Sequence, residues 1–429
     1  MSGAALHPTI LREYDIRGVV GDTLSAGDAR SIGRAFASAT AEEKASPRIC
    51  LGYDGRLSSP DFVAAVEEGM IAAGAEVLRI GRGPTPMLYF SVYHLDADAG
   101  LMVTGSHNPP DHNGFKMMRG PRSPKGGPVY GQAILDLGRR IAAGDFASGS
   151  GSAADAPVFD AYIDRLLRDI DLKRPLKVAW DPGNGATAET VSAVAARLPG
   201  VQRLLNATID GTFPNHHPDP TVPANLRQLQ DAVTGEGLDI GFAFDGDGDR
   251  CGVVDNEGNE IFADKVGVML ARDMSAVRPG AQFVVDVKST GLFATDPELL
   301  ANGAETDYWK TGHSYIKRRV NELDALVGFE KSGHYFFNAP IGRGYDDGLV
   351  SAIAILDMLD RNPGKTMADL RRALPKTWGS PTMSPHCPDE IKYEVVDRVV
   401  ARARDMSDKG ESFSGQRITD LVTVNGVRI

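Results

Sequence analysis

The chain has 429 residues, with 46 Lys and Arg against 57 Asp and Glu, and a net charge of −11 at pH 7. This length exceeds a single hydrophobic core and predicts two to four domains. The acidic balance, with no compensating basic run, argues against a nucleic-acid partner. Cys50, Cys251 and Cys387 have no CxxC spacing, and no apolar run is long enough to span a bilayer. We therefore predict a cytoplasmic protein without a membrane partner.

Three stretches share one local pattern: an apolar strand, then an aspartate, then a glycine-containing turn and a helix-like segment. The aspartates are Asp54, Asp181 and Asp286, which are 127 and 105 positions apart. Strand, turn, helix and strand in repetition is typical of parallel α/β layers. The fold class expected is therefore α/β, with three similar mixed α/β domains in tandem. The three stretches are ICLGYDGRL (49–57), LKVAWDPGNG (176–185) and FVVDVKSTG (283–291).

Turn-rich segments suggest where these domains begin and end. The small-residue segment 142–157 is suited to a hinge, and turn-like stretches follow at 255–262 and 361–366. Residues beyond 366 contain two helix-like runs, and the last thirteen residues predict two short strands around an Asn-Gly turn. The predicted domains are 1–150, 151–255, 256–366 and a C-terminal α+β domain at 367–429.

The stretch LMVTGSHNPPDHNGFKMM (101–118) begins as a buried strand and turns polar after Gly105. Ser106, His107 and Asn108 follow, and two prolines then prevent an immediate helix. These are ordinary turn residues, so a simple turn is one interpretation. The other is a nucleophile held at the carboxyl end of a strand, where α/β sheets bind their ligands. The stretch alone leaves both open.

The stretch FAFDGDGDRCGVVD (242–255) alternates three aspartates, Asp245, Asp247 and Asp249, with glycines. Carboxylates this close repel one another, and a bound cation is the usual reason for keeping them. A solvated acidic turn is the alternative. An EF-hand is excluded because its sixth position would be Arg250 rather than Gly and its twelfth Asn256 rather than Glu. An all-oxygen site with few protein ligands favours Mg²⁺.

Further polar residues lie in glycine-containing loops. Glu330, Ser332 and His334 follow an apolar strand and are suited to a hydroxylated ligand, although a turn is equally compatible. The chain lacks G-x-x-x-x-G-K-[ST], G-x-G-x-x-G after a strand, and G-x-S-x-G, which argues against a P-loop, a nicotinamide site and a hydrolase serine. Other candidates for binding phosphate or balancing charge are Tyr14, Arg17, Lys116, Lys288, Lys310 and His313.

Together these motifs resemble the α-D-phosphohexomutase family, and within it the phosphomannomutase/phosphoglucomutase branch. TGSHNP (104–109) resembles the family's phosphoserine loop, DGDGDR (245–250) its metal loop, and FEKSGH (329–334) its sugar-specificity loop. EYDIRG, WKTGHS and FPNHHPDP (213–220) also match this branch, and the motifs follow the family's order.

The resemblance implies an isomerase of carbohydrate metabolism, a Mg²⁺-dependent intramolecular phosphotransferase acting as a monomer. It would move phosphate between C6 and C1 of mannose or glucose phosphate, with the hexose 1,6-bisphosphate as intermediate and activator. Ser106 would carry the phosphate, an oxygen of which joins Asp245, Asp247 and Asp249 around Mg²⁺. Lys116 is the first candidate for proton transfer and His313 the second. Further implied catalytic residues are Arg17, His107 and Arg250, and the candidates for substrate binding are Tyr14, Lys288, Glu330, Ser332 and His334.

Two departures from the family pattern qualify this expectation. Phe329 and Lys331 replace residues that are more usually small or apolar, so the preferred sugar stays open. The family's R-x-S-[NG]-T-E/T-P loop, which clamps the phosphate not being transferred, has no counterpart, and the chain ends where several dozen further residues are expected. We therefore predict a partial fourth domain and impaired turnover. Phosphoglucosamine mutase is an alternative, disfavoured by the S-G-H sequence, and a catalytically weak sugar-phosphate-binding or regulatory protein is another.

Overall fold

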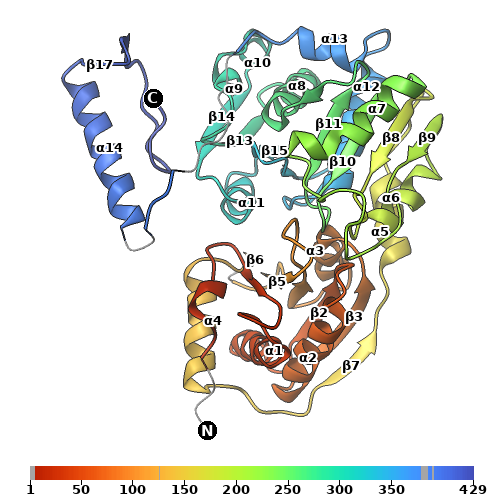
Figure 1. The fold of residues 1–429 in the computed structure, drawn as a ribbon, viewed down its shortest axis with the longest axis vertical. Helices are drawn as coiled ribbons and strands as arrows, with labels where there is room; N and C mark the ends of the chain where they lie inside the picture. Colours follow the sequence, from red (N-terminus) through yellow and green to blue (C-terminus); the bar gives the residue numbers. More distant parts are fainter. Residues whose placement is uncertain (1–4, 125, 378–384, 389–390) are drawn as a thin grey trace.

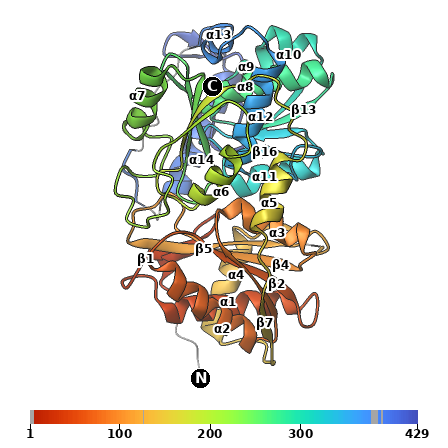
Figure 2. The same cartoon turned by 90° about the vertical axis from the view of Figure 1, so that its right-hand side faces the viewer.

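The computed structural model describes residues 5–124, 126–377, 385–388 and 391–429. In this part of the chain, three mixed β-sheets with flanking helices follow one another along the sequence (Figure 1). The second and third units lie side by side, and the first unit packs against them through α3 (Thr85–His94) and the loop after β4 (Ala99–Val103) (Figures 1 and 2). The predicted fold class, three similar mixed α/β units in tandem, is confirmed.

The first sheet has the strand order β1-β5-β4-β2-β3-β7, with β6 paired to β5. Strands β2, β3, β4 and β7 run parallel, whereas β5 is antiparallel to both β4 and β1. The strands are β1 (Ile16–Val19), β2 (Arg48–Tyr53), β3 (Glu76–Arg82), β4 (Ala99–Val103), β5 (His112–Arg119), β6 (Gly127–Pro128) and β7 (Ser152–Asp155), and the helices are η1 (Pro8–Ile10), α1 (Ala26–Ala41), α2 (Ser59–Ala72), α3 (Thr85–His94) and α4 (Gln132–Ala143).

The second sheet has the order β12-β11-β10-β8-β9, in which β10, β8 and β9 are parallel and β11 and β12 are antiparallel neighbours. Its strands are β8 (Lys177–Asp181), β9 (Val201–Leu204), β10 (Ile240–Phe244), β11 (Cys251–Asp255) and β12 (Glu260–Ile261), and its helices are α5 (Phe159–Leu167), α6 (Ala188–Ala195), η2 (Pro223–Leu226) and α7 (Arg227–Glu236).

The third sheet has the order β14-β13-β15-β16, and the chain ends in α14 and a two-stranded hairpin. The third unit contains β13 (Gln282–Asp286), β14 (Glu305–Trp309), β15 (Val327–Phe329) and β16 (Tyr335–Phe337), with α8 (Ala263–Val277), α9 (Leu292–Thr295), α10 (Pro297–Ala301), α11 (His313–Glu322), α12 (Gly348–Arg361) and α13 (Met367–Arg372). The last elements are α14 (Lys392–Asp408), β17 (Ser412–Phe413) and β18 (Gln416–Arg417).

The three repeated aspartates have the same local role. Each lies at or just after the end of its strand and binds the turn that follows. Asp54 accepts a hydrogen bond from the backbone N–H of Arg56 at 3.0 Å, Asp181 accepts one from Gly183 at 3.0 Å, and Asp286 accepts one from the hydroxyl of Ser289. A side-chain acceptor of this kind fixes a tight turn. The sequence repeat therefore reflects a repeated strand-to-helix turn.

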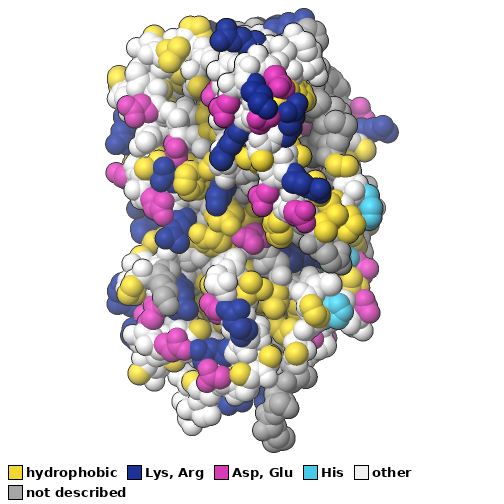
Figure 3. All heavy atoms as spheres, turned by 90° about the vertical axis from the view of Figure 1, so that its left-hand side faces the viewer, with side chains coloured by type: hydrophobic (Ala, Val, Ile, Leu, Met, Phe, Trp, Pro, Cys, Tyr) yellow, Lys and Arg dark blue, Asp and Glu magenta, His cyan; other side chains and the backbone are white. Residues whose placement is uncertain are grey.

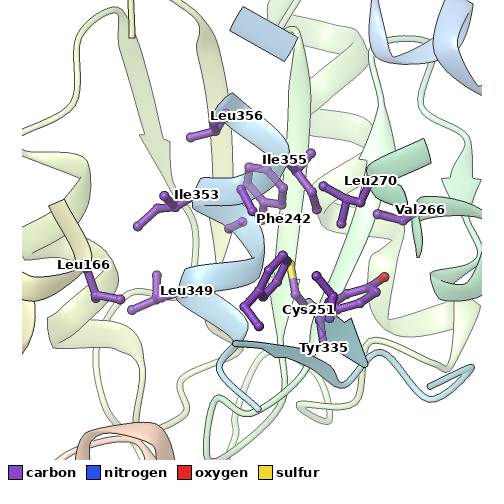
Figure 4. Close-up of a cluster of buried hydrophobic side chains, with 14 of the residues drawn as sticks. Leu166, Phe242, Cys251, Val266, Leu270, Tyr335, Leu349, Ile353, Ile355 and Leu356 are labelled. Carbon is purple, nitrogen blue, oxygen red and sulfur yellow. The ribbon is translucent and has the colours of Figure 1, made fainter. Parts of the chain in front are cut away.

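The second and third units share a hydrophobic core, with α12 at its centre (Figure 4). Leu349 and Ile353 of α12 are buried in the same cluster as Phe242 of β10 and Leu270 of α8. A second cluster fills the space between α1, α2, α4 and the first sheet. These continuous cores hold the strand ends, and the loops that follow them, in fixed relative positions.

Four features differ from the sequence predictions. The predicted hinge contains β7, which pairs with β3, so the first sheet extends past residue 150. Likewise, β12 extends the second sheet past residue 255, because it completes the antiparallel pairing with β11. Met367 of α13 is buried in the core beside α8, although residue 367 was expected to begin the fourth domain. Within the final thirteen residues, the pairing is a single bridge between Val422 and Arg428 rather than two strands.

The face of the molecule that carries α14 is of mixed charge. Figure 3, which faces the side that carries α14, shows Lys and Arg interspersed with Asp and Glu and with hydrophobic side chains. No helix in the described residues is both long and apolar enough to cross a bilayer.

Candidate active site

The loop after β4 presents Ser106 at the boundary between the first and second units. All five residues of β4 are buried, and Ser106 has a φ of 49°, a left-handed conformation that is uncommon for a residue with a side chain. Its Oγ donates a hydrogen bond to Asp245 Oδ2 at 3.0 Å and lies 3.1 Å from His107 Nδ1. The rigid turn therefore aims the hydroxyl at the acidic loop that follows β10.

The acidic loop gathers the carboxylates of Asp245, Asp247 and Asp249, all fully buried, with one oxygen of each within 4.8 Å of the others. Asp247 Oδ1 is buried and has no hydrogen-bond partner among the described residues. Burial, and then repulsion by Asp247 and Asp249, raises the pKa of Asp245 well above its usual value. Three oxygen donors with an unpartnered buried oxygen fit a small divalent cation. These carboxylates form a possible metal site.

Lys116 of β5 neutralises part of this charge. Its ammonium donates to Asp247 Oδ2 at 2.7 Å and also contacts Asp249 Oδ2. Burial by itself lowers the pKa of this lysine, but the two carboxylates outweigh burial and the pKa is raised. A lysine that accepts a proton needs a lowered pKa. The raised pKa of Lys116 is therefore the opposite of what its predicted role as the first proton-transfer candidate requires. The physical reason is the pair of carboxylates on either side of its ammonium group.

Basic side chains surround the serine loop. Arg17 of β1 donates to Asn108 Oδ1 at 2.7 Å and is held by Asp15 at 2.7 Å. Arg250 lies 4.0 Å from Asp245 Oδ2. Burial, and then the guanidinium groups of Arg250 and Arg17, lower the pKa of His107 to about 3. The loop is thus surrounded by two fixed positive charges and a neutral imidazole, which suits a phosphorylated side chain.

The loop between β15 and β16 contributes Glu330, Ser332 and His334. Ser332 Oγ lies 2.8 Å from His334 Nδ1, and Glu330 Oε2 lies 3.2 Å from the same nitrogen. The other ring nitrogen, Nε2, lies 3.2 Å from Asp249 Oδ1, so this loop contacts the acidic loop. Burial lowers the pKa of His334, but Asp249 outweighs burial and raises it to about 9. The three predicted sugar-loop residues therefore form one cluster beside the possible metal site.

His313 and Tyr14 complete the cluster. His313 begins α11; its ring lies 5.7 Å from that of His334 and 5.6 Å from that of Tyr14. Burial, and then the positive charge of Lys317, lowers the pKa of His313 well below its usual value, so the ring is neutral at pH 7. Tyr14 donates to the carbonyl of Thr311 at 3.0 Å, and burial followed by Glu330 raises its pKa to about 12. The His313 ring is therefore a neutral imidazole, and burial together with Lys317 disfavours its protonated form.

Lys288 does not join this cluster. Its side chain is exposed in the turn after β13, and it takes part in none of the hydrogen bonds or ion pairs found among the described residues. Lys310 does not join it either, since its ammonium lies 5.4 Å from the centroid of the Tyr315 ring. Arg17 reaches the serine loop through Asn108, and the other predicted site residues are linked to one another by the contacts given above.

Three residues next to this cluster were missed by the sequence analysis. Thr85, at the start of α3, donates to Asp247 Oδ2 at 2.6 Å. Asp346 is buried between Lys317 Nζ at 2.8 Å, His313 Nδ1 at 3.9 Å and His334 Nε2 at 4.0 Å. Arg56 lies beneath the serine loop. In the sequence each of them looks like an ordinary turn or helix-end residue, so there was no local signal.

Comparison with known proteins places the chain in a family. Sequence profiles of phosphoglucomutase/phosphomannomutase alpha/beta/alpha domains match the chain in order: domain I at residues 8–146, domain II at 160–258 and domain III at 262–378. A phosphoglucomutase of Neisseria gonorrhoeae is 38% identical over 431 residues, covering 99% of this chain and 89% of that protein. A phosphomannomutase/phosphoglucomutase of Pseudomonas aeruginosa is 38% identical over 425 residues, covering 99% and 87%.

Solved structures agree with this assignment. A phosphoglucomutase/phosphomannomutase family protein from Burkholderia thailandensis superimposes with a TM-score of 0.88 at 37% identity, covering 99% of this chain and 88% of that one. A phosphomannomutase-like structure from Thermus thermophilus, at 24% identity and a TM-score of 0.75, shares the fold.

Proposed function

Because the chain belongs to the phosphoglucomutase/phosphomannomutase family, we propose that it interconverts hexose 6-phosphates and hexose 1-phosphates of mannose, glucose or both. The observation that carries this proposal is the position of Ser106, whose Oγ lies 3.0 Å from one of three buried carboxylates. A serine in that position, when phosphorylated, places phosphate oxygens beside a possible cation site and beside Arg17 and Arg250.

The reaction proceeds in two phosphoryl transfers. In the first, a sugar hydroxyl attacks the phosphorus of phosphorylated Ser106, the bond from phosphorus to serine Oγ breaks, and a hexose 1,6-bisphosphate forms. The hydroxyl proton passes to a protein base, and Ser106 Oγ regains a proton. In the second, Ser106 Oγ attacks the other phosphate of the turned-over bisphosphate, which releases the isomeric monophosphate. A free bisphosphate serves as activator, because it phosphorylates a serine that has lost its phosphate.

Of the two proton-transfer candidates, His313 is the protein base proposed, because its ring has a nitrogen without a partner in the part of the chain that the structure describes. The ring is neutral, its Nδ1 has no hydrogen-bond partner among the described residues, and it lies beside the sugar loop. Lys116, the first candidate from sequence, acts instead as an electrostatic partner of Asp247 and Asp249. Arg17, His107 and Arg250 hold the phosphate on the serine, and charge-assisted hydrogen bonds of this kind contribute about 1.5–3 kcal/mol each.

Mg²⁺ is the cation proposed at Asp245, Asp247 and Asp249, joined by an oxygen of the serine phosphate. It would supply positive charge to the phosphoryl group as its bonds change. The sugar hydroxyls are bound by the sugar loop, through Glu330, Ser332 and His334, and Tyr14 lies near this loop beside His313. Lys288 lies outside the cluster, so it would contact the substrate only if its side chain reoriented when the substrate binds.

The remaining parts of the proposal concern partners and location. The protein acts as a monomer on a hexose phosphate, without a nucleic-acid partner, which the net charge of −11 supports. Its cytoplasmic location stays a prediction, and the three free cysteines are compatible with it. Size-exclusion chromatography with light scattering tests the monomer.

The decisive experiment is a coupled mutase assay on mannose 1-phosphate and glucose 1-phosphate, with Mg²⁺ and the matching bisphosphate, for the wild-type chain and Ser106→Ala. We expect turnover only in the wild type, and intact-mass analysis should find one phosphate on the Ser106 peptide. Glucosamine 1-phosphate serves as the competing substrate. Turnover of glucosamine phosphate alone, or full activity of Ser106→Ala, would contradict the proposal.

A further inference from the structure

The loop that carries Ser106 has few hydrogen bonds of its own. Within it, Asn108 N–H donates to Gly105 O at 2.9 Å and His112 N–H donates to Pro109 O at 3.0 Å. The φ of 49° at Ser106 is a conformation that persists only where the surroundings impose it. Some other group must therefore hold this backbone in place.

Arg56 supplies that support. It is 2% exposed and lies beneath the loop, in the turn after β2. All four N–H bonds of its two terminal nitrogens are directed at backbone carbonyls. Nη2 donates to Ser106 O at 2.8 Å and Asn108 O at 2.5 Å, and Nη1 donates to Pro109 O at 2.5 Å and His112 O at 2.9 Å.

Asp54 completes the arrangement from the other side. Its Oδ2 lies 3.3 Å from Arg56 Nε and accepts a hydrogen bond from Gly105 N–H at 3.1 Å, and its Oδ1 accepts one from Arg56 N–H at 3.0 Å. The buried guanidinium charge is thus paired. A Cβ at position 105 would lie 2.4 Å from Arg56 Nε, so only glycine leaves room for this side chain.

The second unit covers Arg56. The ring of Phe213 lies 5.3 Å from Arg56 Cζ. A Cβ on Gly211 would lie 2.7 Å from the Arg56 backbone, which shows how closely this segment approaches. Exclusion of water strengthens the hydrogen bonds beneath the serine.

We propose that Arg56 is a positioning residue for phosphoryl transfer, which holds the backbone of residues 105–112 so that Ser106 Oγ faces the acidic loop. The proposal rests on the proposed function of Ser106. Because all four terminal N–H bonds are used on carbonyls, Arg56 acts through the loop and not on the phosphate. Lysine keeps the charge opposite Asp54, but its single ammonium cannot span four carbonyls.

The test compares Arg56→Lys and Arg56→Met with Arg174→Met. Arg174 is a matched control, because its Nη1 also contacts several backbone carbonyls, those of Leu359, Asn362 and Lys365, in another part of the fold. The measurements are kcat and KM for glucose 1-phosphate, the rate at which glucose 1,6-bisphosphate phosphorylates Ser106, and Tm. Arg56→Lys retains a cation opposite Asp54 and serves as the folded variant if Arg56→Met does not fold.

We expect kcat and the phosphorylation rate of Arg56→Lys to fall about 100-fold, the effect of a displacement of about 1 Å at a reacting group. KM should stay within about threefold of the wild type. Arg174→Met should lower Tm but leave kcat unchanged. Wild-type kcat in folded Arg56→Lys, or an equal loss in Arg174→Met, would overturn the inference. A wild-type chain without turnover and without phosphate on Ser106 would instead overturn the proposed function.

Discussion

At the scale of single residues, the candidate site is a balance of buried charges. Three carboxylates share a space with Lys116, and His334 and Arg250 lie beside them. Each buried charge here is tolerated because an opposite charge is within hydrogen-bond distance or close to it. Removal of one charged side chain therefore leaves its buried partners without an opposite charge. A single substitution should then change the stability of the protein measurably.

Lys116→Met should show this balance directly. The variant leaves Asp247 and Asp249 buried without their ammonium partner, a change that costs about 3–5 kcal/mol. We expect a lower Tm in EDTA and a partial recovery with Mg²⁺, since a divalent cation restores positive charge between the carboxylates. Differential scanning calorimetry with and without Mg²⁺ checks this. Lys265→Met is the control, because Lys265 donates to threonine hydroxyls away from the acidic loop. If the Tm of Lys116→Met is the same with and without Mg²⁺, that result would count against a cation bound by the acidic loop.

His313→Gln tests the neutral imidazole. Its pKa in the folded state is below the value of 6.5 in the unfolded chain, so below pH 6.5 the unfolded chain binds more protons. The stability that this neutral ring contributes is present above pH 6.5 and is lost as the pH falls. Between pH 7 and pH 5 the Tm of the wild type should therefore fall more steeply than that of His313→Gln. The difference corresponds to the uptake of about one proton by His313 on unfolding. Parallel slopes for the wild type and His313→Gln would refute a lowered pKa at His313.

At the scale of elements, the start of α12 packs against the acidic loop. Gly348 N–H donates to Gly248 O at 3.0 Å, and Asp347 caps the helix by accepting hydrogen bonds from Leu349 and Val350. A Cβ on Gly348 would lie 2.7 Å from Arg250 O and 2.8 Å from Gly248 O. The glycine therefore permits the close approach of the third unit to the loop of the second.

Gly348→Ala should displace the acidic loop. Since the added methyl group meets backbone atoms rather than a flexible side chain, the loop has to move, and we expect kcat/KM to fall about 10- to 100-fold. Gly235→Ala in α7 is the matched control, because its Cβ meets no atom within 4 Å. That change should preserve activity and add about 0.5–1 kcal/mol of stability. Steady-state kinetics and Tm for both variants check the prediction, which fails if Gly348→Ala is as active as Gly235→Ala.

At the scale of the whole molecule, each unit contributes a different part of the site. The first provides Ser106, the second the three aspartates, and the third the sugar loop and His313. Contacts across units hold them together: Lys317 of α11, in the third unit, donates to Tyr89 OH of α3, in the first unit, at 3.1 Å. The chemistry therefore depends on the relative placement of the units as much as on any one of them.

The sequence by itself determined the repeated strand-aspartate-turn units and the polar loops that follow the strands, because both depend on local patterns of apolar residues and turn residues. It therefore placed Ser106, the three aspartates and the sugar loop after strand ends, and the resemblance to the family favoured a site over ordinary turns. Domain limits were less well determined, since the pairing of β7 with β3 joins residues 76 positions apart, such as Glu76 and Ser152. Only the tertiary structure revealed Arg56, Thr85 and Asp346 beside these loops, and only it set the direction of the Lys116 pKa. Both depend on charges and carbonyls brought together from distant parts of the chain, which no local pattern records.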